Sequence, residues 1–324
     1  MATIGDIAQK AEVAKSTVSL VLNNTGYVSK QTREKVMAAI QELNYVPNSL
    51  ARNLSLQKSG IVGVMVPDIA NPFFSEFIKY VENELHILGY KTLICNTSGN
   101  EERERDYISM LQRKFMDGLI VGQYELSADH YTDLKCPIVS LDRKIGSDVP
   151  IIRSNHEMAS HLIVEEILRN KCQKVLMFLG TTVQNNTSMK RHELIKENLE
   201  KQAVEVLTIE TDTPYHLDQL IEDVLKKNDI DGAVGADLYI MECLKAVFRS
   251  GKKIPEEFCA IAYDGTFVTE VNTLPVTTIV QPIQELAKQA VSVLGRMMIG
   301  EWEDKHEIII DVQLKHRDTT KKIE

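Results

Sequence analysis

The stretch TIGDIAQKAEVAKSTVSLVLN, residues 3–23, decides which fold we predict for the start of this chain. Thr3 followed by Asp6 is typical of a capping box at a helix start. The apolar residues after it recur at helical spacing: Ile4, Ile7, Ala8 and Ala11. A short break at 12–14 precedes a second apolar stripe, formed by Val18, Val21 and Leu22. The pattern predicts two short helices joined by a tight turn.

A third helix follows. Ser29 can cap it, its apolar stripe is Val36, Ile40 and Leu43, and it stops before Pro47. Three short helices, of which the first two share a tight turn, indicate a helix-turn-helix unit. On this pattern alone, a generic three-helix bundle with a solvated polar face is an equal alternative.

In a helix-turn-helix unit the second helix enters the major groove of DNA, and residues near its N-terminus face the base edges. Lys15 can donate to guanine or to phosphate, and Ser16 can donate or accept. Leu20 offers only an apolar contact, such as one with a thymine methyl. Thr17 and Ser19 suit phosphate contacts that set the register. The second helix is therefore the predicted reading element.

The charge is divided unevenly along the chain. The net charge is −9, yet residues 1–58 carry seven Lys and Arg against four Asp and Glu. The remaining residues carry 30 basic and 42 acidic side chains. This division favours a small module for a polyanion attached to a body with a different task. A net of +3 is small enough for a chance fluctuation to be the alternative.

The body has the pattern of two α/β units. At 324 residues, we expect two or three domains. Short apolar strands alternate with helices, first over 61–141 and then over 174–263. Two doubly wound parallel sheets would place a ligand crevice at the carboxyl ends of their strands and between the lobes. No glycine-rich phosphate loop follows any of these strands, which argues against a dehydrogenase, and we predict no cofactor and no metal.

The apolar runs, the N-terminus and the cysteines predict the cellular location of the protein. There is no run of about 18 apolar residues, so we expect no transmembrane helix and no membrane partner. The N-terminus lacks a secretory pattern. The five cysteines are widely spaced, and an odd number cannot all pair within one chain. We therefore expect a cytoplasmic protein with structural thiols.

Specific residues in the head resemble the lactose/galactose repressor (LacI/GalR) family. They are the run 3–8, then Thr17-Val18-Ser19-x-Val21-Leu22-Asn23, and Leu43-Asn44-Tyr45-x-Pro47-Asn48-x-x-Ala51-Arg52-x-Leu54. The similarity extends to about residue 319. It implies a homodimeric transcription regulator whose core resembles a periplasmic binding protein and responds to a small molecule.

The resemblance assigns residues to DNA. In the head these are Thr3, Lys15, Ser16, Thr17, Ser19, Leu20, Asn23 and Tyr27. Asn48 would cap a single hinge turn that also contains Ala51 and Arg52. Such a short helix is unstable alone. By resemblance two hinge helices pair in the minor groove, where Leu54 acts as a wedge. The alternative for Leu54 is a core leucine of the head.

The resemblance also assigns an effector site. Its expected residues are Asn71, Phe73, Phe74, Asp142, Arg191, Asp237, Asp264 and Gln281. Arg supplies a planar fork of donors, Asp accepts from hydroxyls, and a Phe packs on an apolar sugar face. Two alternatives remain open: Asp264 and Arg191 form a structural ion pair, and one of the two Phe belongs to the core. The chain lacks the Gly-Phe that commonly follows the cleft arginine, so its pocket differs from the usual one.

Together these observations predict a domain plan and a function. The head spans 1–47, a hinge helix and linker span 48–60, and the core spans 61–324. We expect lobe 1 at about 61–156 plus 282–311, and lobe 2 at about 157–281 plus 312–324. The predicted protein is a repressor, not an enzyme, that binds a pseudo-palindromic operator as a homodimer under allosteric control by a sugar or sugar derivative. The alternative is a two-lobed sugar-binding protein or enzyme without DNA recognition.

Overall fold

The computed structural model describes residues 2–23, 25–45, 58–122, 124–180, 187–211, 213–302 and 307–322. The chain divides into two compact units, residues 1–59 and 60–324, and each is described by itself. Within the described ranges, no helix is both long and apolar enough to cross a membrane.

The first unit is the predicted helix-turn-helix head. Its helices are α1 (Ile4–Lys10), α2 (Lys15–Asn23) and α3 (Lys30–Glu42). Thr3 and Asp6 form the expected capping box, and the Ser29 side chain accepts from the backbone N–H of Thr32. Ile7, Val18 and Val36 are fully buried at its centre. The spacing of the apolar residues thus places one face of each helix in a shared core.

Lobe 1 of the second unit contains a six-stranded parallel sheet in the order β11-β5-β4-β3-β1-β2. The strands are β1 (Ile61–Val66), β2 (Lys91–Asn96), β3 (Gly118–Val121), β4 (Ile138–Leu141), β5 (Ile151–Ser154) and β11 (Glu307–Ile310). β1, β3 and β4 are buried almost throughout, as expected for strands covered on both faces.

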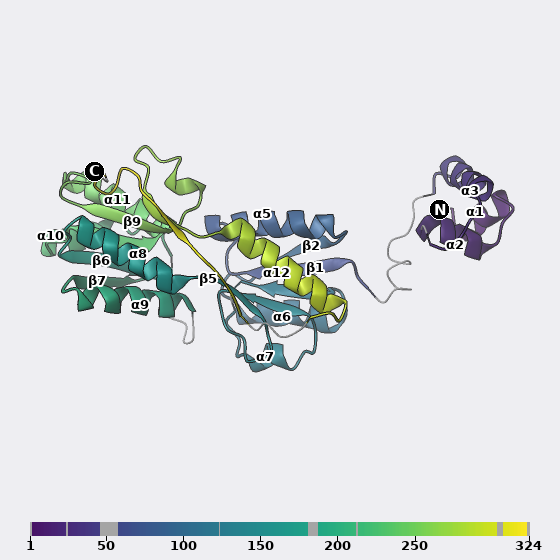
Figure 1. The fold of residues 1–324 in the computed structure, drawn as a ribbon, viewed down its shortest axis with the longest axis horizontal. Helices are drawn as coiled ribbons and strands as arrows, with labels where there is room; N and C mark the ends of the chain where they lie inside the picture. Colours follow the sequence, from purple (N-terminus) through teal and green to yellow (C-terminus); the bar gives the residue numbers. More distant parts are fainter. Residues whose placement is uncertain are drawn as a thin grey trace. The chain divides into compact units, whose positions relative to one another are not determined.

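Helices cover both faces of this sheet (Figure 1). On one face lie α5 (Pro72–Ile87) and α12 (Ile283–Met298), which share a core with β1. On the other face α6 (Glu101–Gln112) and the short α7 (Asp129–Thr132) pack over a second core. Because α12 comes from late in the chain, lobe 1 is built from two separate segments of sequence.

Lobe 2 repeats the plan with the order β12-β10-β9-β8-β6-β7. The strands are β6 (Lys174–Leu179), β7 (Glu205–Glu210), β8 (Gly232–Ala236), β9 (Cys259–Asp264), β10 (Thr277–Val280) and β12 (Gln313–Lys315). All neighbours are parallel except β12, which runs antiparallel to β10 at the sheet edge. The predicted pair of doubly wound parallel sheets is confirmed, with this one antiparallel strand added.

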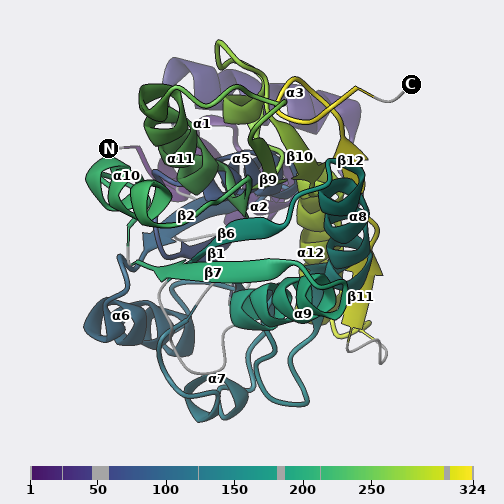
Figure 2. The ribbon, with the colours of Figure 1, turned by 90° about the vertical axis from the view of Figure 1, so that its left-hand side faces the viewer.

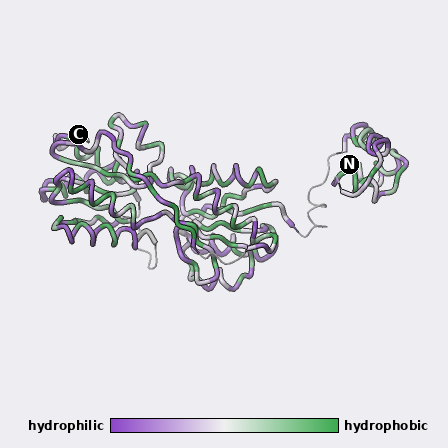
Figure 3. Tube along the Cα trace, in the orientation of Figure 1, coloured by the Kyte–Doolittle hydropathy of each residue, from purple (hydrophilic) through white to green (hydrophobic). Residues whose placement is uncertain are grey.

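The helices of lobe 2 again lie in two layers (Figure 2). One layer holds α8 (His156–Arg169) and α9 (Thr187–Lys201), and the other holds α10 (Asp218–Lys227) and α11 (Asp237–Ser250). The 3-10 turn η1 (Phe267–Thr269) follows β9. Hydrophilic and hydrophobic positions alternate along the helices (Figure 3), as amphipathic helices between core and solvent require.

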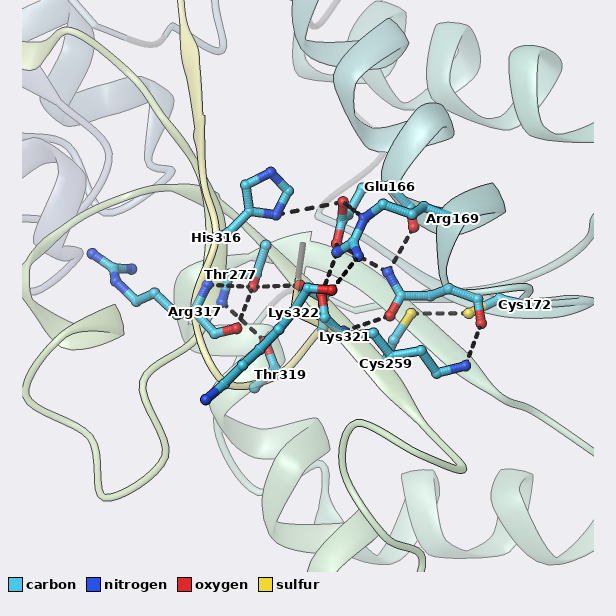
Figure 4. Close-up of polar contacts among 12 residues, drawn as sticks. Glu166, Arg169, Cys172, Cys259, Thr277, His316, Arg317, Thr319, Lys321 and Lys322 are labelled. Carbon is cyan, nitrogen blue, oxygen red and sulfur yellow. Dashed lines mark hydrogen bonds and ion pairs between the residues drawn. The ribbon is translucent and has the colours of Figure 1, made fainter. Parts of the chain in front are cut away.

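The end of the chain is tied into lobe 2. The Thr319 hydroxyl accepts from the backbone N–H of Thr277 at 2.9 Å, and Arg169 donates to the carbonyl of Lys322 at 3.2 Å. Figure 4 shows these contacts beside the thiols of Cys172 and Cys259, whose sulfur atoms lie 2.9 Å apart. All five cysteines are free.

Strand order fixes where a ligand site can form. In both sheets the second strand lies outside the first, and the third begins on the other side of the first. The helices that follow these strands therefore leave in opposite directions and open a crevice at the strands' carboxyl ends. The candidate residues Asp142, Asp264 and Gln281 lie at or directly after such ends.

Gly265 gives a test of the turn that ends β9. Its φ is +71°, and an added Cβ would stand 2.6 Å from the Val280 Cα. Gly265→Ala should therefore incur the left-handed penalty of about 1–2 kcal/mol and a further cost from overpacking of about 1–3 kcal/mol. Gly99→Ala is the matched control, because its φ is +65° but an added Cβ meets nothing. Denaturant unfolding that gave equal losses for both variants would contradict this account of the turn.

Candidate functional site

The candidate DNA-reading face is the exposed side of α2. Val18 and Val21 point into the head core, so residues on the opposite side of the helix face outward. Lys15, Ser16 and Leu20 are exposed there. Thr17 and Ser19 are half-buried at the edges of this face. The helix thus presents one cation, one hydroxyl and one apolar side chain near its N-terminal half, as the sequence predicts.

The remaining head residues have more specific local roles. The Thr3 hydroxyl and backbone N–H both bond to Asp6, which lowers the pKa of that carboxyl. Asn23 donates to the Ser19 hydroxyl at 3.2 Å. Tyr27 is 94% exposed and projects from the turn after α2, so it is available to a partner.

The hinge residues Asn48, Ala51, Arg52 and Leu54 lie outside the described residues. Their assignment to the minor groove stays a prediction.

In the second unit, His156 connects the candidate residue Asp142 to Tyr263 across the lobe junction. His156 is the first residue of α8 in lobe 2, and its Nε2 lies 2.8 Å from Asp142 Oδ1, just after β4 of lobe 1. Its Nδ1 lies 2.7 Å from the Tyr263 hydroxyl on β9. Burial alone would raise the pKa of Asp142, but His156 and Arg191 outweigh burial and lower it. The ionised carboxylate thus accepts a hydrogen bond from the imidazole.

A second polar connection crosses the same junction. Ser154 at the end of β5 donates to Gln281 Oε1 at 2.7 Å, and Gln281 Nε2 donates to Asp264 Oδ1 at 2.7 Å. All three side chains are buried. Burial is the main reason why the pKa of Asp264 rises to about 6. Gln281 therefore orients one carboxylate oxygen of Asp264 from the crossover between lobes.

Two of the candidate carboxylates sit on unusual backbone. Asp142 has a φ of 59° and Asp264 a φ of 128°, both in the region that favours glycine. Such conformations cost about 1–3 kcal/mol and concentrate at functional sites. The backbone at the ends of β4 and β9 therefore sets the direction of these two side chains at a cost in local stability.

Arg191 on α9 does not pair with Asp264. Its guanidinium lies over the Tyr263 ring, 4.1 Å from the centroid. Among the described residues no ion pair within 4 Å joins Arg191 to a carboxylate. The alternative of a structural Asp264–Arg191 ion pair is therefore not what the structure contains.

Asp237 has a structural role that the sequence did not suggest, and its contact with an effector stays a prediction. It is 2% exposed at the start of α11 and accepts from the backbone N–H groups of Gly265 and Thr266, and from the Thr266 hydroxyl at 2.6 Å. Burial, and then the charge of Asp264, raise its pKa well above the usual range. Through these three bonds Asp237 positions the turn that follows β9.

The two phenylalanines also separate. Phe73 is 8% exposed and belongs to the lobe 1 core, whereas Phe74 is only partly buried against it. Their rings meet edge to face at 5.3 Å. Asn71 caps α5 through the backbone N–H of Phe73. Of the pair, Phe74 is the one left to contact a ligand, and Phe73 is a core residue.

Four residues of this site are absent from the predicted set: Ser154, His156, His192 and Tyr263. Ser154, His156 and Tyr263 lie at or next to strand ends, where we already expected ligand contacts. Position at a strand end was therefore the available signal. Nothing in the pattern around His192 marked it out.

Comparison with known proteins identifies the family of this chain. Residues 3–48 match the family described as bacterial regulatory proteins, lacI family, and residues 164–320 match a periplasmic binding protein-like domain. The ribose operon repressor of Halalkalibacterium halodurans is 34% identical over 99% of this chain and 98% of its own length. The chain belongs to the LacI family. As a member it is a DNA-binding transcription regulator.

Two solved structures of the family share its fold. A periplasmic binding protein/LacI transcriptional regulator from Alkaliphilus metalliredigens, in complex with D-xylulofuranose, is 26% identical and covers 81% of this chain and all of its own, with a TM-score of 0.74. The lac repressor dimer bound to operator is 24% identical over 98% of this chain and 99% of its own, with a TM-score of 0.86. The second likeness concerns the fold alone.

The raised pKa of Asp264 predicts how the stability of this LacI-family chain depends on pH. A carboxyl with a raised folded-state pKa stabilises the fold below the unfolded value of 3.8, and this contribution is lost as pH rises through about 6. Asp264→Asn removes the charge but keeps an acceptor for Gln281. The variant should be more stable than the wild type by about 1–3 kcal/mol at pH 8 and equally stable near pH 3.5.

The measurement is the free energy of unfolding in denaturant across that pH range. Asp106→Asn, at an exposed position of α6, serves as the control and should follow the wild type. A parallel pH profile for Asp264→Asn and the wild type would refute the assigned pKa.

Proposed function

We propose that this chain is a repressor that binds a pseudo-palindromic operator as a homodimer and is controlled allosterically by a sugar or sugar derivative. The single observation that carries this proposal is the 34% identity, over nearly the whole chain, to the ribose operon repressor of Halalkalibacterium halodurans. The D-xylulofuranose bound to the Alkaliphilus relative supports the same ligand class.

The proposed DNA contacts come from the exposed face of α2. Lys15 donates to a guanine edge or to phosphate, Ser16 bonds to a base edge, and Leu20 packs against a thymine methyl. Thr17 and Ser19 at the edges of this face contact phosphates. A two-fold dimer presents this face twice, so the operator has two related half-sites. A protein that acts on chromosomal DNA in a bacterium works in the cytoplasm.

The proposed effector site lies at the strand ends of both lobes. Arg191 supplies donors, Asp142 and Asp264 accept from ligand hydroxyls, Gln281 holds Asp264, and Phe74 covers an apolar ring face. Because His156 and Gln281 bond to residues of both lobes, a ligand that changes the angle between lobes alters these contacts. An effector with different affinities for two lobe arrangements then shifts operator occupancy, typically by about 1–3 kcal/mol.

Lys15→Ala tests the reading face. For a duplex selected from a random pool, removing a base contact worth about 1–3 kcal/mol should weaken binding by about 5–150-fold. Lys10→Ala is the matched control, because Lys10 pairs with Glu42 on α3 and should leave affinity within about twofold. Fluorescence anisotropy at 50 and 200 mM salt measures both variants, and wild-type affinity should fall steeply with salt. If the wild type preferred no duplex in the selection, the proposed function would be wrong.

A further inference from the structure

Two buried nitrogen atoms beside the proposed effector site lack hydrogen-bond partners. They are Nε of Arg191 and Nδ1 of His192, and neither bonds to any atom of the described residues. His192 is 7% exposed. A buried polar atom without a partner costs about 1–3 kcal/mol, and native structures contain few of them. The described residues contain one other such atom, Thr92 Oγ1 on β2. What distinguishes Arg191 and His192 is that both atoms lie on adjacent residues of one helix, so one ligand group could satisfy both.

The chemistry of both atoms can be assigned. Arg191 Nη2 lies 3.5 Å from His192 Nε2, and because a guanidinium can only donate, Nε2 accepts. Burial first, and then the charges of Arg191 and His156, lower the pKa of His192 well below its usual value, so the ring is neutral. Its one proton therefore sits on Nδ1. The site presents two unpaired N–H donors, one on each residue.

Carboxylates supply the opposite chemistry nearby. Arg191 lies over the ring of Tyr263, and Asp264 is the next residue, at the end of β9. The Tyr263 hydroxyl also meets His156, which bonds to Asp142. The charge of Arg191 lowers the pKa of both carboxyls. Each of these aspartates has one oxygen engaged, Oδ1 with His156 or with Gln281. Asp142 is ionised, and at pH 7.5 Asp264, with a pKa of about 6, is mostly ionised as well. A ligand at this site would therefore meet N–H donors of Arg191 and His192 together with carboxylate acceptors.

A hydroxyl group matches this combination, because it accepts from an N–H and donates to a carboxylate at once. A phosphate dianion only accepts, and it would bring about two negative charges into a site that already holds the carboxylates of Asp142 and Asp264. Charge repulsion in a buried site therefore opposes phosphorylated ligands.

We infer that His192 is a specificity-determining residue, which with Arg191 holds a hydroxyl oxygen of the ligand, and that the site selects uncharged polyhydroxyl compounds over their phosphate esters. This inference rests on the proposed function, since it refines the class of effector. It adds a contact residue that the LacI-family resemblance did not supply.

The first experiment compares ligand classes on the full chain. Isothermal titration at pH 7.5 uses D-ribose, D-xylulose and D-fructose, each beside its phosphate: ribose 5-phosphate, xylulose 5-phosphate and fructose 6-phosphate. At least one free sugar should bind, and its phosphate should bind at least tenfold more weakly. A phosphate that binds as tightly as its parent sugar, or a set with no binder, would overturn the inference.

The second experiment isolates the Nδ1–H donor with the sugar that binds. His192→Leu should raise its Kd at least tenfold. His192→Asn should stay within about threefold of the wild type, because the Asn amide nitrogen can occupy the position of Nδ1. His161→Leu, an exposed histidine on α8, is the matched control and should leave Kd unchanged.

Unliganded stability separates a ligand contact from a merely structural role. His192→Leu removes an unpaired donor, which favours the fold, and also the Nε2 acceptor of the 3.5 Å contact from Arg191, which opposes it. Its Tm without sugar should therefore stay close to that of the wild type. A lower Tm with an unchanged Kd would assign His192 to the core instead and overturn the inference. Operator binding is measured in parallel. If the wild type binds its operator but no free sugar binds more tightly than its phosphate, the inferred ligand class is wrong and the proposed regulator stands. If the wild type prefers no DNA sequence, the proposed regulator itself is rejected.

Discussion

One imidazole bonds directly to both lobes. His156 lies 2.8 Å from Asp142 of lobe 1 and 2.7 Å from Tyr263 of lobe 2, and all three groups are largely removed from water. Hydrogen bonds in such surroundings are costly to leave unmade, at about 1–3 kcal/mol for each stranded group. A change of the angle between the lobes must therefore lengthen at least one of these contacts or rotate the ring with them. The junction favours discrete arrangements over continuous bending, and discrete arrangements are what an allosteric ligand can select.

Two further sets of hydrogen bonds join the lobes. Ser154 of lobe 1 bonds to Gln281, which in turn holds Asp264 of lobe 2. Away from the strand ends, Glu76 on α5 accepts from the backbone N–H of Phe267 at 3.0 Å. A coupling free energy of about 1–3 kcal/mol needs only one or two such hydrogen bonds to differ between arrangements. The free energy of these hydrogen bonds is thus large enough to account for allosteric coupling without a large change in the core of either lobe.

The fold was predictable because periodic patterns determine it. Buried strands such as β3 and β4 stand out as apolar runs, and the caps at Thr3 and Ser29 mark helix starts with a local mechanism. The site was less predictable, because it depends on where side chains point. Phe73 and Phe74 are neighbours in sequence, but a helix turns by about 100° per residue, so one is buried in the core and the other is not. The bonds from Asp237 to the turn at Gly265 and Thr266 depend on how that turn folds back, which no sequence pattern shows. His192 gave no signal at all, since only burial distinguishes it.

The placement of Arg191 determines what the site is able to do. A guanidinium paired with Asp264 would satisfy both groups internally and leave little for a ligand. Instead the guanidinium of Arg191 lies over the Tyr263 ring, and its Nε–H has no partner among the described residues. Tyr263 also bonds to His156. The tyrosine that supports Arg191 is thus the same residue that contacts the imidazole at the lobe junction. A ligand that draws on the Arg191 donors therefore acts on the lobe junction through two consecutive contacts, which links occupancy of the site to the arrangement of the lobes.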